Sequence, residues 1–424
     1  MDDDAATSQP RPALGRQLRG ARTLARHWWP VILLGLLTIG SYGFVVYSFS
    51  VLIGPIHDST GWSVGALSGS FTLSLLIGGL ISPATGWMLD RFGGRPVILG
   101  SLAIGSAFLL LASVAKTLPV FVLGWGVGGG VVSAGLFYNV TMALTTRLFR
   151  AERVRAFAIL TFIGGLASVL YFPLAGLLVD LLSWRMAVRV LVVLMVLHVL
   201  PAGLAISGGR AANAGPKVGT LSGIVAVFRS REVVQMIAML SVAGMAFGAI
   251  QVHHVPAMRA AGVSLGAATT IASVRGFLSL PGRALMEPVV RRLGVPGAIG
   301  LAYGLMAIGI VPLAVHGSIA WPLLFMLVTG LAFGAISPLQ GLYAAEVFGE
   351  RRIGTMMGVQ SLVVSLVSAT GPALVGVSVD ATDSYSVAMI LTSCLFVGAI
   401  VLLVTRPRVA AADLVVVSTS ALGE

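Results

Sequence analysis

The sequence predicts an all-α membrane protein, and three observations lead to that prediction. Hydrophobic residues make up 57% of the 424-residue chain and charged residues only 10%, whereas charged residues are about a quarter of an ordinary soluble domain. The hydrophobic residues fall in runs of about 20, enough to cross a hydrocarbon core of about 30 Å as a helix. Several short sequence segments and single residues of the first half recur in the second half at a similar spacing. We therefore expect twelve transmembrane helices in two six-helix pseudo-repeats.

The recurring landmarks lie about 200 residues apart. Residues 83–96 (PATGWMLDRFGGRP) and 281–296 (PGRALMEPVVRRLGVP) each lead from one apolar helix through a basic turn into another. Three further pairs are separated by 199, 198 and 200 positions: Phe149 and Phe348, Glu152-Arg153 and Glu350-Arg351, and Asp180 and Asp380. Such a constant offset indicates a duplicated unit. Many secondary transporters are built from duplicated halves with the substrate site between them.

Each of the twelve expected spans is a mostly apolar segment of helical length. They cover residues 28–53, 62–88, 96–115, 118–146, 157–180, 185–207, 232–257, 264–289, 296–316, 319–345, 355–379 and 385–405. No segment shows the period-2 alternation of a membrane β-barrel. The spans divide the chain into a tail at 1–27, a bundle at 28–207, a linker at 208–231, a bundle at 232–405 and a tail at 406–424.

The tails and the linker carry no expected span. No small-residue cleavage site precedes the first apolar run, so we expect no removable signal peptide. Residues 207–219 are rich in Gly, Ala and Asn, which is typical of a flexible linker. Residues 220–230 are expected to form a short amphipathic helix on the membrane surface.

The basic residues predict the orientation. Of 27 Lys and Arg, 21 fall on the side that carries both termini, four on the other side and two within a span. This bias places both termini in the cytoplasm and accounts for the net charge of +12 through loops that face an anionic leaflet. No basic patch has interleaved aromatic residues, so nucleic acid is not expected as a partner. The excess of Arg over Lys favours a bacterial source, hence the inner membrane.

One short motif indicates the family. The segment GWMLDRFGGRP, with Gly86, Asp90, Arg91, Gly93 and Arg95, resembles the loop 2–3 signature of the major facilitator superfamily, G-x-x-x-D-R-x-G-x-R. With twelve spans in two halves, the resemblance covers nearly the whole chain. It implies the major facilitator fold and a secondary carrier that works by alternating access. No G-x-x-x-x-G-K-[ST] loop for ATP is present.

The signature is interpreted as a gating motif. Its first glycine allows close helix approach, its aspartate accepts from the N-terminal amides of a neighbouring helix, and its arginines pair with acids of adjacent loops. Direct substrate contact is not expected. In the second copy, Glu287 and Pro288 stand where Gly86 and Trp87 would, and no acid matches Asp90.

Three segments are similar to bacterial relatives of the monocarboxylate transporter family: residues 61–96, HHVP at 253–256 and SLPGR at 279–283. That family carries an arginine in the eighth helix that pairs with the substrate carboxylate, and Arg283 is the best match. The chain departs from the family before helix 1, where it reads RHWWP, and one turn before the arginine, where Ser279 replaces an acid. Proton coupling by the family's usual residues is therefore not implied.

The eighth helix itself points to an anionic ligand. Arg275 lies near its middle and Arg283 two turns nearer the cytoplasm, about 80° apart around the axis. An arginine at mid-bilayer costs at least a few kcal/mol, so it should face a cavity, an acid or a ligand. None of the fifteen carboxylates lies mid-span. Substrate binding by both arginines is therefore expected, with a Glu287 pair for Arg283 or a carbonyl partner for either as the alternative.

Two adjacent histidines are the candidates for proton coupling. His253 and His254 lie towards the outer end of the seventh span and titrate near neutral pH. The alternative is a histidine held by a carbonyl near the break at Pro256. Consecutive helical positions point about 100° apart, so at most one should face the cavity.

Six other polar residues lie within spans and are candidates for substrate binding. Each serves equally well as a helix–helix hydrogen-bonding group. They are Tyr138, Asn139, Gln251, Gln340, Tyr343 and Gln360.

These observations favour a secondary transporter for a small, monocarboxylate-like organic anion, with or without a coupled proton. The alternatives are efflux of a xenobiotic or an oxyanion, and a sensor that binds without transport. Drug antiporters of the superfamily carry a Gly-Pro motif in helix 5, where this chain has Phe172-Pro173. No His/Asp/Glu cluster is present, so neither an enzyme, a metal site nor a cofactor is expected. The oligomeric state is left open.

Overall fold

The computed structural model describes residues 14–149, 152–206, 230–348 and 353–406, and its regular elements there are helices. The first half contains α1 (Leu14–Tyr42), the π-helix η1 (Gly43–Ser48), α2 (Phe49–Thr60), α3 (Val64–Phe92), α4 (Gly94–Ser113), α5 (Leu118–Leu136), α6 (Tyr138–Leu148), α7 (Arg153–Leu181) and α8 (Trp184–Ala205). The second contains α10 (Arg231–Ala260), α11 (Leu265–Ala284), α12 (Met286–Ile310), the 3₁₀-helix η2 (Val311–Ala314), α13 (Ala320–Phe348), α14 (Ile353–Ser368), α15 (Thr370–Thr382) and α16 (Tyr385–Val404).

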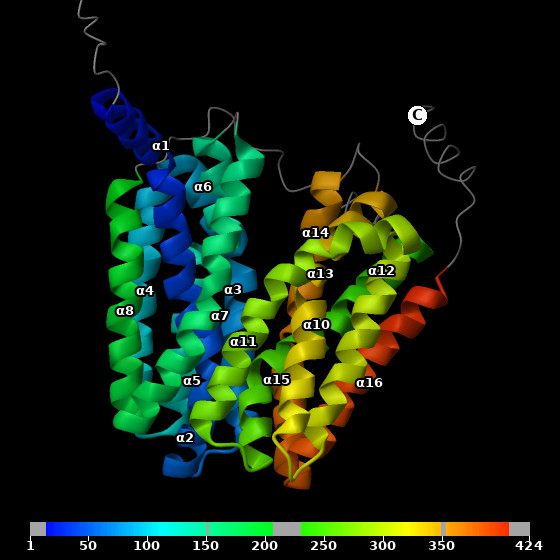
Figure 1. Cartoon of the computed structure of the whole chain (residues 1–424). Coiled ribbons are helices and arrows are strands. Elements are labelled where there is room, and N and C mark those ends of the chain that lie inside the picture. Colours follow the sequence, from blue (N-terminus) through cyan, green and yellow to red (C-terminus); the bar gives the residue numbers. More distant parts are fainter. Residues whose placement is uncertain (1–13, 150–151, 207–229, 349–352, 407–424) are drawn as a thin grey trace, which may run out of the picture.

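The helices form two groups side by side, α1–α8 and α10–α16 (Figure 1). α3 and α7 of the first group lie against α15 and α11 of the second. α1 begins and α16 ends at the same end of the molecule (Figure 1), which we call the terminal end. The opposite end, where α2 ends and α3 begins, is called the far end.

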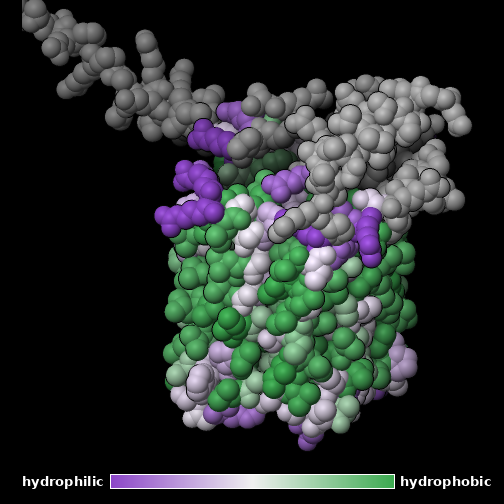
Figure 2. Space-filling model, turned by 90° about the vertical axis from the view of Figure 1, so that its right-hand side faces the viewer, coloured by the Kyte–Doolittle hydropathy of each residue, from purple (hydrophilic) through white to green (hydrophobic). Residues whose placement is uncertain are grey.

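Eleven stretches of the described chain are long and apolar enough to cross a membrane. They are Trp28–Thr60, Val64–Phe92, Gly94–Ser113, Leu118–Leu148, Arg155–Leu181, Trp184–Ala205, Arg231–Ala260, Met286–Ala314, Ala320–Ala344, Leu362–Thr382 and Tyr385–Val404. Each overlaps an expected span. Figure 2 shows one face of the resulting surface, with a hydrophobic band across the middle and hydrophilic residues towards both ends. Such a large exposed apolar surface is suited to lipid.

The expected span at 264–289 is the one without a counterpart among these eleven. Its helix, α11, has 20 residues, and two of them are Arg275 and Arg283. At 1.5 Å per residue it is about 30 Å long, enough to cross a bilayer. The helix is therefore long enough to cross a membrane, but its residues are less hydrophobic on average than those of the eleven stretches.

The structure tests the prediction for the N-terminal tail but not the prediction for the linker helix. α1 already begins at Leu14, well before the expected start of the first span at residue 28, so part of the predicted tail is helical. The predicted linker helix at 220–230 lies outside the described residues except for its last position. The landmarks Glu350 and Arg351 lie outside them as well.

The expected span at 118–146 is broken into α5 and α6. Phe137 between them is extended (φ −85°, ψ −175°), and its ring stacks on Tyr42 of α1 with centroids 3.9 Å apart. The Ser41 hydroxyl donates to the carbonyl of Leu136 at 3.1 Å. A broken helix at membrane depth needs such a partner, because freed backbone groups find no water there.

The two halves begin corresponding helices in the same way. Ser63 caps α3 and Ser264 caps α11, and each side chain accepts from the amide three residues on, Ala66 at 3.1 Å and Ala267 at 3.3 Å. Their backbone angles agree within a few degrees, φ −64° and ψ 149° against φ −62° and ψ 153°. This local match agrees with the duplication read from the sequence.

Candidate functional site

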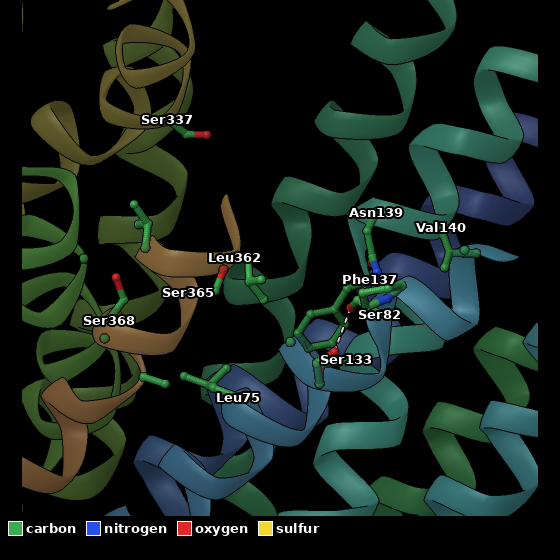
Figure 3. A pocket seen from close by; sticks show the side chains of 18 of the residues that line it. Leu75, Ser82, Ser133, Phe137, Asn139, Val140, Ser337, Leu362, Ser365 and Ser368 are labelled. Atoms are coloured by element: carbon green, nitrogen blue, oxygen red, sulfur yellow. Dashed lines mark hydrogen bonds between the residues drawn. The ribbon is translucent and has the colours of Figure 1, made fainter. Parts of the chain in front are cut away.

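A cavity of about 1020 Å³ lies between the two halves. Its walls come from α3, α5 and α6 on one side and from α10, α13 and α14 on the other. Figure 3 shows hydroxyl groups on both walls and an amide on one, with Ser82, Ser133 and Asn139 on one side and Ser337, Ser365 and Ser368 on the other. A roomy cleft with a mostly apolar lining and a few polar groups suits a small-molecule ligand.

The cavity reaches the terminal end. Asp90, near the end of α3, and Arg147, near the end of α6, are the charged residues that line it. The Asp90 carboxylate accepts from the Arg147 guanidinium, which also donates to the carbonyl of Leu89 at 3.0 Å. The two charges compensate each other, and the rest of the lining is uncharged, consisting mostly of apolar side chains with a few hydroxyl and amide groups.

The far end is closed by contacts between the halves. The Asp380 carboxylate of α15 accepts from the backbone amides of Val64 and Gly65, the first residues of α3, at 2.9 and 2.8 Å. One turn further along α3, the Ser68 hydroxyl lies 3.4 Å from Nε2 of His253. A Cβ atom on Gly376 would come within 3 Å of Gly65 and Ser68. The cavity is therefore accessible from one end.

Arg275 is buried, with 3% of its surface exposed, and is held by one face of α13. Phe325, Thr329 and Phe333 are spaced by four residues, which places them on that face. The Arg275 Nε donates to Thr329 Oγ1 at 2.8 Å, and the guanidinium carbon lies 5.3 and 4.8 Å from the ring centroids of Phe325 and Phe333. These are cation–π distances. Nη2 is buried and has no hydrogen-bond partner in the described part of the chain.

Two stacked aromatic rings lie between Arg275 and the cavity. Phe333 stacks on Phe247 of α10 with centroids 4.7 Å apart, and Phe247 lines the cavity. Arg275 itself is not among the lining residues. A rotation of these two rings would connect the guanidinium with the cavity.

Tyr47 places a phenol of the first half near both arginines. It lies in the π-helical segment η1, within electrostatic range of Arg275 and Arg283, and Tyr138 of α6 lies within the same range of Arg283. Arg283 is exposed. π-Helical turns are frequent at functional sites. Tyr47 was not among the sequence candidates, and its only signal there was a tyrosine in an apolar span.

The alternative pairing of Arg283 with Glu287 is not formed. α11 ends at Ala284 and α12 begins at Met286, so the two residues do not share a continuous helix. Glu287 lies 3.8 Å from Arg291 instead, and both side chains are exposed.

The two histidines point in different directions, as their spacing requires. His253 Nε2 lies 2.9 Å from the carbonyl of Pro372 in α15. His254 Nδ1 lies 2.6 Å from the carbonyl of Ile250, and its ring meets Phe172 of α7 edge-on. Both side chains are fully buried, and neither lines the cavity.

Of the six other polar candidates, Asn139 and Gln340 line the cavity. Asn139 donates to the carbonyl of Ala134 at 3.0 Å, and Gln340 donates to the hydroxyl of Tyr303 at 2.9 Å. The other four are not among the lining residues. Tyr138 packs beside the tyrosine of α1, Tyr343 accepts from Arg406 at 3.3 Å, and Gln251 and Gln360 each keep an Oε1 without a partner in the described chain.

The gating motif differs in detail from its interpretation. The partner found for Asp90 is the Arg147 side chain, where helix N-terminal amides were expected. Nothing lies within 4 Å of a Cβ on Gly86, because the cavity occupies that space. Gly93 has φ +84°, a conformation that favours glycine. Of the arginines, Arg91 lies over the Trp87 ring at 5.8 Å.

The fifth residue of the motif, Arg95, lies in the first turn of α4. Its side chain is exposed.

Comparison with known proteins gives consistent results. The family model described as Major Facilitator Superfamily matches residues 35–372 and 255–416. Human monocarboxylate transporter 11 is 27% identical over 356 residues, which cover 79% of this chain and 74% of the transporter. The MFS-type transporter YcxA of Bacillus subtilis is 25% identical over 400 residues, covering 89% and 94%. The oxalate:formate antiporter of Oxalobacter formigenes is 28% identical over 152 residues, covering 36% and 35%.

Solved structures share the fold. The nucleoside transporter NupG superposes with a TM-score of 0.76 at 14% identity, covering 91% of this chain and all (100%) of that chain. A bacterial homologue of the human lysosomal transporter Spinster, in an inward-facing and unoccupied conformation, gives 0.69 at 16% identity, covering 89% and 96%.

Proposed function

This chain belongs to the major facilitator superfamily and resembles its monocarboxylate transporters, and from that premise we propose that it carries a small organic anion by alternating access. It is a transporter and not an enzyme. One observation carries the substrate class: a buried guanidinium whose Nη2 has no partner in the described chain, separated by two stacked rings from a cavity without net charge.

An unpaired N–H group of a buried guanidinium is costly, because desolvation is not repaid by a hydrogen bond. A carboxylate compensates both the charge and the geometry, since guanidinium and carboxylate form two parallel hydrogen bonds. In the described chain, the ring contacts and Thr329 satisfy Arg275 only in part. A cationic substrate would be repelled. Two relatives are named for monocarboxylate and for oxalate and formate, all of which are small carboxylates.

The topology follows from the same proposal. α11 is the twelfth membrane helix, and its polarity reflects its place beside the substrate. The excess of basic residues at the terminal end assigns that end to the cytoplasm, in the inner membrane of a bacterium. Residues 1–27, 208–231 and 406–424 are then a cytoplasmic tail, the linker and a second tail around bundles at 28–207 and 232–405. The cavity opens to the cytoplasm.

Alternating access requires the far end to open when the terminal end closes. The hydrogen bonds of Asp380 and the contact between Ser68 and His253 would break in that change. The two histidines remain the candidates for a coupled proton. The substrate would bind first in the cavity, beside the polar side chains of Asn139 and Gln340, and then move onto Arg275 as Phe247 and Phe333 rotate.

A second candidate is efflux of a larger anion. The cavity of about 1020 Å³ is at the upper limit of pockets that hold drug-sized molecules, and it exceeds what a three-carbon acid fills. Measuring which anions the protein transports therefore decides between uptake of a small carboxylate and efflux of a larger anion.

The test is uptake of labelled acetate, lactate, pyruvate and oxalate into proteoliposomes. We expect saturable uptake by the wild type and a loss of roughly 10- to 100-fold in Arg275→Gln, since a hydrogen bond to a charged group contributes about 1.5–3 kcal/mol. Arg283→Gln tests the second arginine. Arg259→Gln, which removes an arginine of the same half that bonds the carbonyl of Val263 near the far end, is the matched control.

Thermal unfolding in detergent establishes that each variant is folded. Undiminished uptake in Arg275→Gln would refute the role of Arg275. If folded wild type transports none of these acids, the small-carboxylate proposal fails and larger anions are tested in the efflux direction.

A further inference from the structure

The hydrogen bond of His254 fixes which nitrogen of its ring carries the proton. Nδ1 lies 2.6 Å from the carbonyl oxygen of Ile250. A carbonyl oxygen only accepts, so Nδ1 is the N–H group of the neutral ring. Nε2 is then a bare lone pair, and it is buried without a hydrogen-bond partner in the described chain. The ring therefore presents an unused proton acceptor inside the protein.

This acceptor and the unpartnered guanidinium flank the same aromatic ring. His254 and Arg275 both flank the ring of Phe325, whose centroid is 6.1 Å from the imidazole and 5.3 Å from the guanidinium carbon, and the two groups interact electrostatically. A lone pair without a donor and an N–H group without an acceptor thus occur in one buried region. A proton on Nε2 together with an anion that accepts from both groups would satisfy the region.

The remaining neighbours of His254 leave few charged groups to consider. α7 contributes the Phe172 ring at 5.2 Å, and α13 contributes the Phe325 ring. The titratable or charged groups that act on His254 are Arg275 of α11 and His253 of its own helix, and Tyr47 of η1 adjoins the Phe172 ring at 5.3 Å. No carboxylate is among these groups, so the described part of the chain supplies no counter-charge for a second cation here.

We propose that His254 is the proton-binding residue of the substrate site, and that a carboxylate at Arg275 and a proton on His254 Nε2 bind cooperatively. The inference rests on the proposed function. A proton from water forms the new N–H bond at Nε2, and the carboxylate accepts from that group and from Arg275 Nη2. Without the anion, an imidazolium beside a guanidinium is repelled at low dielectric. Without the proton, the carboxylate has one donor fewer. One proton thus accompanies one anion.

His253 has a different assignment. Its Nε2 faces the Pro372 carbonyl at 2.9 Å and so carries the proton, and Ser68 of the first half lies 3.4 Å away. Its ring therefore joins α10 to α15 and α3 at the far end. This makes His253 a positioning residue for closure and a suitable control.

The experiment measures lactate binding to purified protein between pH 5.5 and 8. If one proton is taken up with each lactate, the affinity for lactate falls by up to roughly tenfold for each unit that the pH rises. We expect this dependence of affinity on pH in the wild type. His254→Asn keeps an amide donor near the position of Nδ1 but has no group at Nε2, and it should bind weakly without a slope. His253→Gln keeps a donor at the position of Nε2, and it should retain the slope.

A second measurement uses the unsubstituted protein, so that it does not depend on the folding of any variant. Lactate added to wild type in weak buffer should draw close to one proton per bound lactate from solution. Binding without proton uptake, or a slope that persists in His254→Asn, would overturn the role of His254 and leave anion transport standing. Loss of the proposed function has a different signature, namely lactate binding that is absent in the wild type or unaffected by Arg275→Gln.

Discussion

The contact between Asp380 and the start of α3 predicts how the two access states are balanced. Asp380→Asn keeps the size of the side chain but removes its charge and one of its two acceptors. A carboxylate at a helix N-terminus contributes about 1 kcal/mol, and up to about 2 kcal/mol in favourable geometry. Asp380 makes two short bonds, at 2.9 and 2.8 Å, but its side chain is exposed. We therefore expect a loss of about 1–2 kcal/mol from the state closed at the far end.

A change of that size shifts the ratio of the two states roughly 5- to 30-fold towards opening at the far end. The assay is the distance distribution between spin labels at Ser59→Cys, in the last turn of α2, and Thr382→Cys, at the end of α15. Both positions are exposed and belong to different halves. The native Cys394 is exposed as well, so it is replaced by alanine. The population with the longer distance should increase in Asp380→Asn.

Two further variants separate this mechanism from a general effect of charge. Asp180 occupies the corresponding end of α7, is exposed, and has no hydrogen bond to α11 in the described chain. Asp180→Asn should therefore leave the distances unchanged. Val64→Pro removes one of the donors, and proline is well tolerated at the first position of a helix. Its effect should not add to that of Asp380→Asn. Unchanged distances in Asp380→Asn, or equal shifts in both asparagine variants, would contradict the reasoning.

Two other predictions concern stability, measured by thermal unfolding in detergent. Asp90→Asn and Arg147→Gln should each destabilise the protein by about 1 kcal/mol or less, because the ion pair is partly exposed. The double variant should lose less stability than the two single variants together. Additive losses would argue against the ion pair. Gly371→Ala should destabilise the protein by about 1–3 kcal/mol, because the new Cβ would collide with the Met245 carbonyl. Gly304→Ala is the control and should leave the stability unchanged, because the space around its Cβ is open. Equal losses in both variants would refute the packing argument.

The sequence predicted the helices because their signal is local. A run of about 20 apolar residues can be recognised without knowing its neighbours, and eleven of the twelve expected spans have counterparts. The family was likewise predicted from a short motif and is confirmed by the family model. The break at Phe137 was missed, because it depends on Ser41 and Tyr42 of another helix.

The site depends on contacts that a single sequence does not reveal. Asp380 and Val64 are 316 residues apart, and the groups that Asp380 binds are backbone amides, which every residue possesses. The partner of Asp90 is an arginine 57 residues away. The contacts of Arg275 with two phenylalanine rings were also unexpected. A buried charge is expected to have polar partners, and aromatic residues within an apolar span are usually interpreted as packing residues.

The most informative element is the one that conforms least to the expected pattern. α11 is the expected span whose composition falls short of an apolar membrane helix. It lies against α7 of the other half, and it places Arg275 in a region without a carboxylate. Polar residues persist in a membrane helix only where something compensates their cost. In α11 the compensation by Thr329 and the rings is incomplete, since Nη2 has no partner in the described chain. The incompleteness is what a transient anionic ligand requires, because a fully satisfied arginine would have no reason to bind one.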